Sequence, residues 1–159
     1  MCQEGLIRRI LDGVYEKPQY SKILEDYLPT NPETVAYAIA NHYRWSIAPC
    51  GDIALNKLHL STQVPIVWSY ISDGPYRDYK LGDITITYKH RTNRNISGMT
   101  PVSVLVIEAL KTLGQDGVDD DTIAVLKKQL SVNDKKLLLS ESSRSSSWII
   151  NTIKEVCKT

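Results

Sequence analysis

The strongest constraint on the fold is a change of hydrophobic pattern near residue 100. Before that point the segment DITITYKHR alternates, with Ile84, Ile86 and Tyr88 separated by threonine or lysine, which is typical of a half-exposed β-strand. The segment VPIVWSYIS is rich in β-branched and aromatic residues and predicts a buried strand. After residue 100 the apolar residues recur at helical spacing. The pattern predicts an α+β fold, in which a small mixed sheet with flanking helices is followed by a helical C-terminal tail.

A helix is expected from Asn31 onward. Asn31 is a good N-cap, Pro32 suits the first helical position, and Glu33 complements the positive end of the helix dipole. The spacing predicts one helix face that comprises Val35, Ala38, Ile39 and His42. WSIAP then predicts a short strand ended by Pro49, and GDIALNKLHL predicts a second short helix.

Four helices are expected in the tail. The first covers VSVLVIEALKTL, begins at Thr100 and Pro101, and ends at Gly114. The second runs through TIAVLKKQL and is opened by the aspartates at 119–121. The third is VNDKKLLL, with Asn133 or Ser131 as its cap. The fourth is SSWIINTIKEVCK, and its expected core stripe is Trp148, Ile149, Ile153 and Val156.

The remaining segments are expected to be connections. Proline, glycine and serine punctuate them, which favours turns and loops over regular structure. They are PQYSKILEDYLPTNP, STQVP and the turn-rich DGPYRDYKLGD, together with ESSRSSS, which is either a polar connector or a helix start.

A β-hairpin is predicted close to the first residue, in EGLIRRILDGVYEKPQYSK. LIRRI and VYEKP flank Asp12 and Gly13, and an Asp-Gly pair supplies the positive φ angles of a tight hairpin turn. A lone hairpin is marginal in water, so this one is expected to belong to a larger unit.

Composition limits the classes of function. The net charge is +1, so overall charge gives no steering toward nucleic acid or anionic membranes, and any such role must come from a local patch. No apolar run is long enough to cross a bilayer, and the first residues lack a signal-peptide pattern. The three cysteines are widely spaced and odd in number, which favours free thiols in a reducing compartment. We therefore expect a cytoplasmic protein without a membrane partner.

The most suggestive polar segment is YKHRTNRNISGM, at residues 88–99. Its cations, with those just before the preceding strand and those of the hairpin, could meet phosphate oxygens, while asparagine and threonine supply neutral donors. The alternative is a strand end and loop that are simply solvated. The predicted nucleic-acid-binding residues are Arg8, Arg9, Lys17, Arg77, Lys80, Lys89, His90, Arg91 and Arg94.

Catalytic and metal sites are not indicated. His42, His59 and His90 are not at ligand spacing, and DGVDDD lacks the alternating oxygen ligands of a calcium loop. No GxSxG turn or phosphate-cradling glycine loop is present. Glu108 could be a buried catalytic carboxylate, but a helix edge or a partner for Lys111 is favoured. We predict a protein that is not an enzyme and carries neither metal nor cofactor.

Several blocks together resemble a known family. EGLIRRILDGVYEKPQYS is similar to the end of a winged helix-turn-helix with its wing strand. The blocks APCGDIALNKLHLSTQVP, YISDGPY and KHRTN resemble the body of AbiEi-like antitoxins, the transcriptional regulators of type IV toxin–antitoxin operons.

The resemblance implies two regions, residues 1–20 as a remnant wing hairpin and residues 21–159 as the AbiEi-like body. It also implies a transcriptional regulator that binds promoter DNA and neutralises a cognate toxin indirectly. A winged helix needs about three helices before its wing, and only three residues precede Glu4, so sequence-specific DNA binding is expected to be weak in this form.

Two other functions stay open at this point. The helical tail, through the Leu137–Leu139 run and the Trp148 stripe, could mediate homodimerisation or bind a toxin. An enzyme of nuclease or nucleotidyltransferase type would need clustered carboxylates or a metal, and no such cluster can be placed in the sequence.

Overall fold

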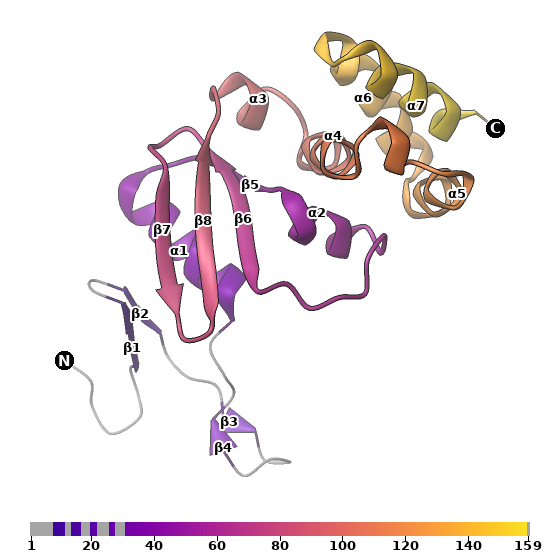
Figure 1. The fold of residues 1–159 in the computed structure, drawn as a ribbon. Coiled ribbons are helices and arrows are strands. Elements are labelled where there is room, and N and C mark those ends of the chain that lie inside the picture. Colours follow the sequence, from indigo (N-terminus) through magenta and orange to yellow (C-terminus); the bar gives the residue numbers. More distant parts are fainter. Residues whose placement is uncertain (1–7, 12–13, 17–19, 22–25, 28–30, 159) are drawn as a thin grey trace.

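A computed structural model describes residues 8–11, 14–16, 20–21, 26–27 and 31–158, the first four of these ranges by their backbone alone. The protein has the predicted α+β fold, with a mixed sheet followed by a helical tail (Figure 1). In chain order, the elements are β1 (Arg8–Leu11), β2 (Val14–Glu16), β3 (Tyr20–Ser21), β4 (Asp26–Tyr27), α1 (Pro32–Tyr43), β5 (Ile47–Pro49), α2 (Gly51–Lys57), β6 (Val67–Ser72), β7 (Arg77–Leu81), β8 (Ile84–His90), α3 (Arg94–Ser97), α4 (Pro101–Leu113), η1 (Gln115–Gly117), α5 (Asp120–Gln129), α6 (Val132–Glu141), η2 (Ser142–Arg144) and α7 (Ser147–Cys157).

The main sheet has four strands in the order β5-β6-β8-β7. β6 and β8 are parallel, while β5–β6 and β7–β8 are antiparallel pairs, so the sheet is mixed, as predicted. β7 lies inside DGPYRDYKLGD, which was expected to be a turn-rich link, and that expectation is wrong. Tyr79 and Leu81 of β7 pair with Ile86 and Ile84 of β8, but charged residues between them conceal the strand pattern.

Helix α1 covers one face of the sheet (Figure 1). Asn31 caps it as predicted, because its side chain accepts a hydrogen bond from the backbone N–H of Glu33 at 2.9 Å. Val35 and Ile39 are buried as predicted, but Ala38 and His42 are exposed. The buried stripe includes Ala36 and Ala40 instead, and the small side chain of Ala36 lets the helix lie close to the tyrosines of the sheet.

Helices α2, α3 and α4 lie on the other face of the sheet, over β5 and β6. Ala48 and Ile71 of the sheet join Ile96 of α3 and Val104 of α4 in one buried cluster. Figure 1 shows α1 behind the sheet, whereas no helix of the described residues crosses the front of β7 and β8. Among the described residues, the face of β7 and β8 opposite α1 is therefore not covered by a helix, and its side chains are polar.

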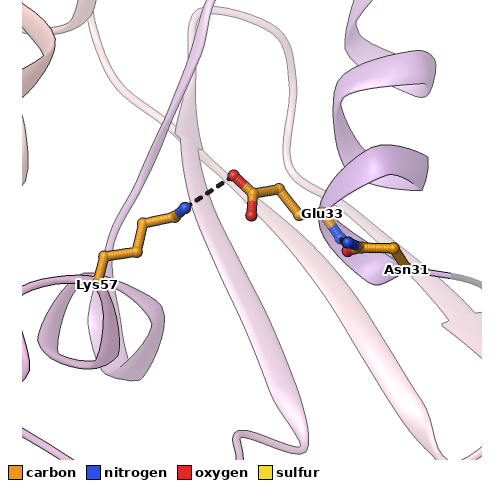
Figure 2. A network of polar contacts seen from close by, with 3 residues as sticks. All are labelled: Asn31, Glu33 and Lys57. Carbon is orange, nitrogen blue, oxygen red and sulfur yellow. Dashed lines mark hydrogen bonds and ion pairs between the residues drawn. The ribbon is translucent and has the colours of Figure 1, made fainter.

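An exposed ion pair joins the two helices that lie on opposite sides of the sheet. Lys57 Nζ of α2 lies 2.8 Å from Glu33 Oε1 at the start of α1 (Figure 2). Such a pair contributes only about 0–1 kcal/mol, so the buried clusters rather than this contact hold α1 and α2 in place.

The tail forms its own buried cluster, in which Leu110, Leu126, Leu138 and Ile153 are fully buried. The four predicted helices are confirmed, with N-caps Thr100, Asp119, Ser131 and Ser146. Ser131, not Asn133, caps α6 and forms a capping box with Asp134. Trp148 is half-buried, whereas Ile149, Ile153 and Val156 are buried as predicted.

The N-terminal region contains the predicted hairpin, in which Arg8 pairs with Glu16 and Arg9 with Tyr15. Its turn residues, Asp12 and Gly13, lie outside the described residues. β3 and β4 form a second small antiparallel pair inside the segment that was expected to be a plain connector. The expected boundary between residues 20 and 21 falls within β3. No helix among the described residues is long and apolar enough to span a membrane.

Candidate nucleic-acid interface

A network of polar contacts lies where the parallel strands β6 and β8 both end. The backbone N–H of Ser46 donates to Asp73 Oδ1 at 2.8 Å, and Asn93 Nδ2 donates to Asp73 Oδ2 at 2.8 Å. The backbone N–H of Asp73 donates in turn to the carbonyl of Ser46. Asp73, which directly follows β6, thus ties the start of the β5 region to the segment that follows β8.

A second group of contacts fixes the turn after β6. His90 Nδ1 donates to the carbonyl of Gly74 at 2.8 Å, since a carbonyl can only accept, and this assigns the proton of a neutral ring to Nδ1. The backbone N–H of Gly74 donates to Ser72 Oγ at 3.0 Å. A Cβ at Gly74 would collide with the ring of Trp45, so this close approach requires glycine.

The segment after β8 is held by its backbone. Arg91 N–H donates to the carbonyl of Ser72 at 2.7 Å, and its guanidinium donates to the carbonyl of His90 at 2.8 Å. The carbonyl of Asn93 accepts from Ile96 and Ser97, which closes the short helix α3 in a segment expected to be a loop. The basic segment is therefore built into the end of the sheet.

The register places the predicted cations on both faces of the sheet. Arg77 pairs with Tyr88, so Arg77 and His90 are on the α1 side, whereas Lys80 and Lys89 are on the side of Thr85 and Thr87. Arg77, Lys80 and His90 are exposed, and Lys89 and Arg91 are half-buried. The structure brings Arg77, Lys89, His90 and Arg91 together at one end of the sheet, while Lys80 lies further along β7.

The structure does not place the side chains of the other four predicted residues. Arg8 and Arg9 are in β1 and Arg94 begins α3, and the structure describes their backbone only. Lys17 lies outside the described residues.

The cations at the sheet are available to a ligand. Within the described part of the chain, the ion pairs are Glu33–Lys57, Glu108–Lys111 and Glu155–Lys158. No carboxylate of that part pairs with Arg77, Lys80, Lys89 or Arg91. The nearby Asp73 carboxylate is already occupied by Ser46 and Asn93.

The buried thiol of Cys50 is influenced by charges of the basic segment and of α4. Burial raises the pKa of Cys50 to about 11, and the Glu108 carboxylate adds to this, while Lys89 and Arg91 act in the opposite direction. Charges of both signs, from β8, the segment after it and α4, thus act on the same buried thiol.

Glu108 has the predicted partner, because Lys111 Nζ lies 3.3 Å from its Oε2. It is also buried, with 7% of its surface exposed. No three His, Cys, Asp or Glu side chains of the described residues gather to hold a metal, and the absence of a metal or cofactor in the protein remains a prediction.

Sequence reasoning missed Ser46, Asp73 and Gly74, which hold the basic segment, and took Asn93 for a donor to phosphate, whereas its amide donates to Asp73. Two of the sequence blocks singled out above, YISDGPY and KHRTN, are the segments that meet here. Each block alone gives no reason to expect contact with the other.

The fold defines a small α+β protein with a polar network and exposed cations at one end of a mixed sheet. Residues 1–138 match the model of the family of unknown function DUF6088, and the chain belongs to that family. The match extends from the N-terminal hairpin into α6 and leaves out η2 and α7. Comparison with curated proteins and with solved structures found no match.

Proposed function

We propose that this protein is a non-enzymatic, nucleic-acid-binding regulator of the AbiEi antitoxin type, which acts in the cytoplasm on promoter DNA and on a toxin indirectly. The observation that supports the proposal is the set of cations at the end of β8 and along β7, which pair with no carboxylate of the described residues. Unpaired lysine and arginine side chains of this kind can donate hydrogen bonds to phosphate oxygens.

The open face of β7 and β8 suits a phosphate backbone. Lys80 is opposite Thr85, and Lys89 follows four residues along β8, so the two lysines are about 13 Å apart along the strand. The hydroxyls of Thr85 and Thr87 lie between them as neutral donors, and the exposed Asp78, opposite Thr87, is the one carboxylate of these two strands on this face. Contacts of this kind position a protein on DNA without reading its bases, so we expect binding that is weakly sequence-specific and strongly salt-dependent.

The test is fluorescence anisotropy with duplex DNA from upstream of the gene, over a series of salt concentrations. The variant Lys80→Gln/Lys89→Gln is compared with Lys127→Gln/Lys128→Gln, which removes two exposed lysines from α5. Each lost phosphate contact lowers the slope of log K against log salt by about 0.9, so the first variant should lose roughly 1.8 and the control nothing. Equal slopes for the two variants, or no binding by the wild type, would refute the proposal.

A protein-interaction module is the second candidate, and the exposed apolar loop before β6 favours it. Val64 is 84% exposed and Ile66 69% exposed, and the two residues lie close together in the loop between α2 and β6. The helical tail has a smaller exposed apolar surface than was expected, because Leu138 is buried in the tail core. Of the apolar residues of α6, Val132 and Leu139 are exposed. Light scattering over a range of concentrations tests whether a homodimer forms, and a strict monomer would count against this second function.

A further inference from the structure

A cavity of about 370 Å³ lies between α3, α4 and η2, apart from the open sheet face. Its volume is within the range of small-molecule sites in proteins. It combines an apolar wall with both signs of charge. The side chains that matter for what it could bind are Met99, Val104, Ile107, Glu108, Lys111 and Arg144.

The acidic part of the cavity is Glu108. Val104, Glu108 and Lys111 recur at helical spacing on α4, so the same helix face carries both the apolar wall and the carboxylate. The side chain of Glu108 is only 9% exposed. Lys111 Nζ, 3.3 Å from Oε2, is the one cation that pairs with it among the described residues, and this distance exceeds that of a strong charge-assisted hydrogen bond. The carboxylate lines the cavity and has room for a further cationic donor there.

The basic part of the cavity is Arg144, with Lys111 beside Glu108. Arg144 is exposed and pairs with no carboxylate of the described residues. Glu141 also lines the cavity, but its carboxylate accepts from Thr100 and Ser103 at the start of α4 and is not free to hold the guanidinium.

We propose that this cavity binds a zwitterionic α-amino acid with an aliphatic side chain. The ammonium group of the ligand would donate to Glu108, its carboxylate would accept from Arg144, and its side chain would lie against Met99, Val104 and Ile107. A ligand with only a negative charge would meet Glu108 and Glu141, and one with only a positive charge would meet Lys111 and Arg144, so the lining disfavours both. The proposal does not depend on nucleic-acid binding.

Isothermal titration calorimetry of the full chain tests the charge requirement. The ligands are L-leucine, its methyl ester, which keeps only the ammonium, and N-acetyl-L-leucine, which keeps only the carboxylate. L-Leucine should bind, and each single-charge analogue should bind roughly tenfold or more weakly. Equal binding of an analogue, or no heat with L-leucine, L-valine and L-methionine, would overturn the proposal.

Variants test the assigned residues. Glu108→Gln keeps the shape of the side chain and removes its charge, and Arg144→Gln removes an exposed guanidinium that the fold does not use. Both should weaken L-leucine binding by roughly tenfold or more, whereas Lys136→Gln, an exposed change on α6, should leave it unchanged. Thermal melting checks that each variant is folded, and if Glu108→Gln is unfolded, Arg144→Gln alone decides. Unchanged binding in a folded Arg144→Gln variant would overturn the assignment.

Discussion

Two buried tyrosines, side by side in the sheet, allow a matched test of hydrogen-bond energetics. Tyr70 of β6 and Tyr88 of β8 are direct partners in the parallel register, on the α1 face, and neither is exposed to solvent. The Tyr88 hydroxyl donates to the carbonyl of Ala36 in α1 at 2.6 Å. The Tyr70 hydroxyl is buried with no hydrogen-bond partner among the described residues.

The same substitution should therefore have opposite effects at the two positions. Tyr88→Phe loses a hydrogen bond and should destabilise the protein by about 1 kcal/mol. Tyr70→Phe removes a buried hydroxyl that gains nothing on folding, and should be neutral or stabilising by about 1–3 kcal/mol. The double variant should be close to the sum of the two only if the rings do not shift, because the residues are in contact.

Urea denaturation followed by tryptophan fluorescence measures the difference, provided that the m-values agree. A loss of stability in Tyr70→Phe as large as in Tyr88→Phe would refute the reasoning, since it would show that the Tyr70 hydroxyl is satisfied in solution. pH provides an independent check. Burial raises the pKa of both phenols, so the folded chain keeps protons that the unfolded chain releases above about pH 10, and stability falls as pH rises past that value. Each Phe variant should make this fall shallower.

Three further predictions concern single residues. Glu141→Ala should destabilise the protein by about 2–4 kcal/mol, because it removes the hydrogen-bond acceptor of Thr100 and of the fully buried Ser103. Burial opposes ionisation of Glu141, but the bonds from Ser103 and Thr100 outweigh it and lower its pKa, so its contribution is present above the ordinary glutamate range and lost in acid. The stability difference between wild type and variant in urea titrations should therefore be smaller at acidic than at neutral pH, and an unchanged difference would contradict this. Gly74→Ala should lower the melting temperature through the clash with Trp45, at a cost of about 1–3 kcal/mol, whereas Gly117→Ala, which meets only an ordinary contact with Leu113, should not. In a Cys2→Ser/Cys157→Ser background, Cys50 should react with a disulfide reagent at least roughly 100-fold more slowly than a free thiol, because burial raises its pKa from 9.0 to about 11; rapid labelling of the native protein would show that the α4 side of the sheet opens readily.

The sequence predicted most elements because their signals are local. Asn31–Pro32, Thr100–Pro101 and Ser131 with Asp134 are capping patterns that do not depend on what the helix packs against. The strand β7 was missed for the opposite reason. Its residues RDYKL form a strand because they pair with β8, where Ile84, Ile86 and Tyr88 are opposite Leu81, Tyr79 and Arg77. Turn residues on both sides obscured the alternation of apolar and polar residues in this short segment.

Only the charged residues of the candidate site could be predicted from the sequence, and their contacts could not. Lys89, His90 and Arg91 are adjacent in the sequence, so a basic cluster could be recognised, but the strand period divides them between two faces. The network through Asp73 and the cavity beside Glu108 depend on contacts between segments that are far apart in the chain. Ser46 and Asp73 are 27 residues apart, and Thr100 and Glu141 are 41 residues apart. At such separations the sequence spacing of two residues does not indicate whether they are in contact.

The strand order has a consequence for how the chain folds. β6 and β7 are consecutive in sequence and joined by a four-residue turn that contains Asp73-Gly74, yet β8 lies between them. A direct β6–β7 hairpin is the nearest competing structure, because Asp-Gly turns favour hairpins and local pairing is fast. If it forms first, it must open before β8 can enter. Asp73 also contacts Asn93, and the carbonyl of Gly74 accepts from His90, and these two contacts exist only after β8 is in place. We therefore expect the network that positions the basic segment also to stabilise the native strand order relative to the β6–β7 hairpin.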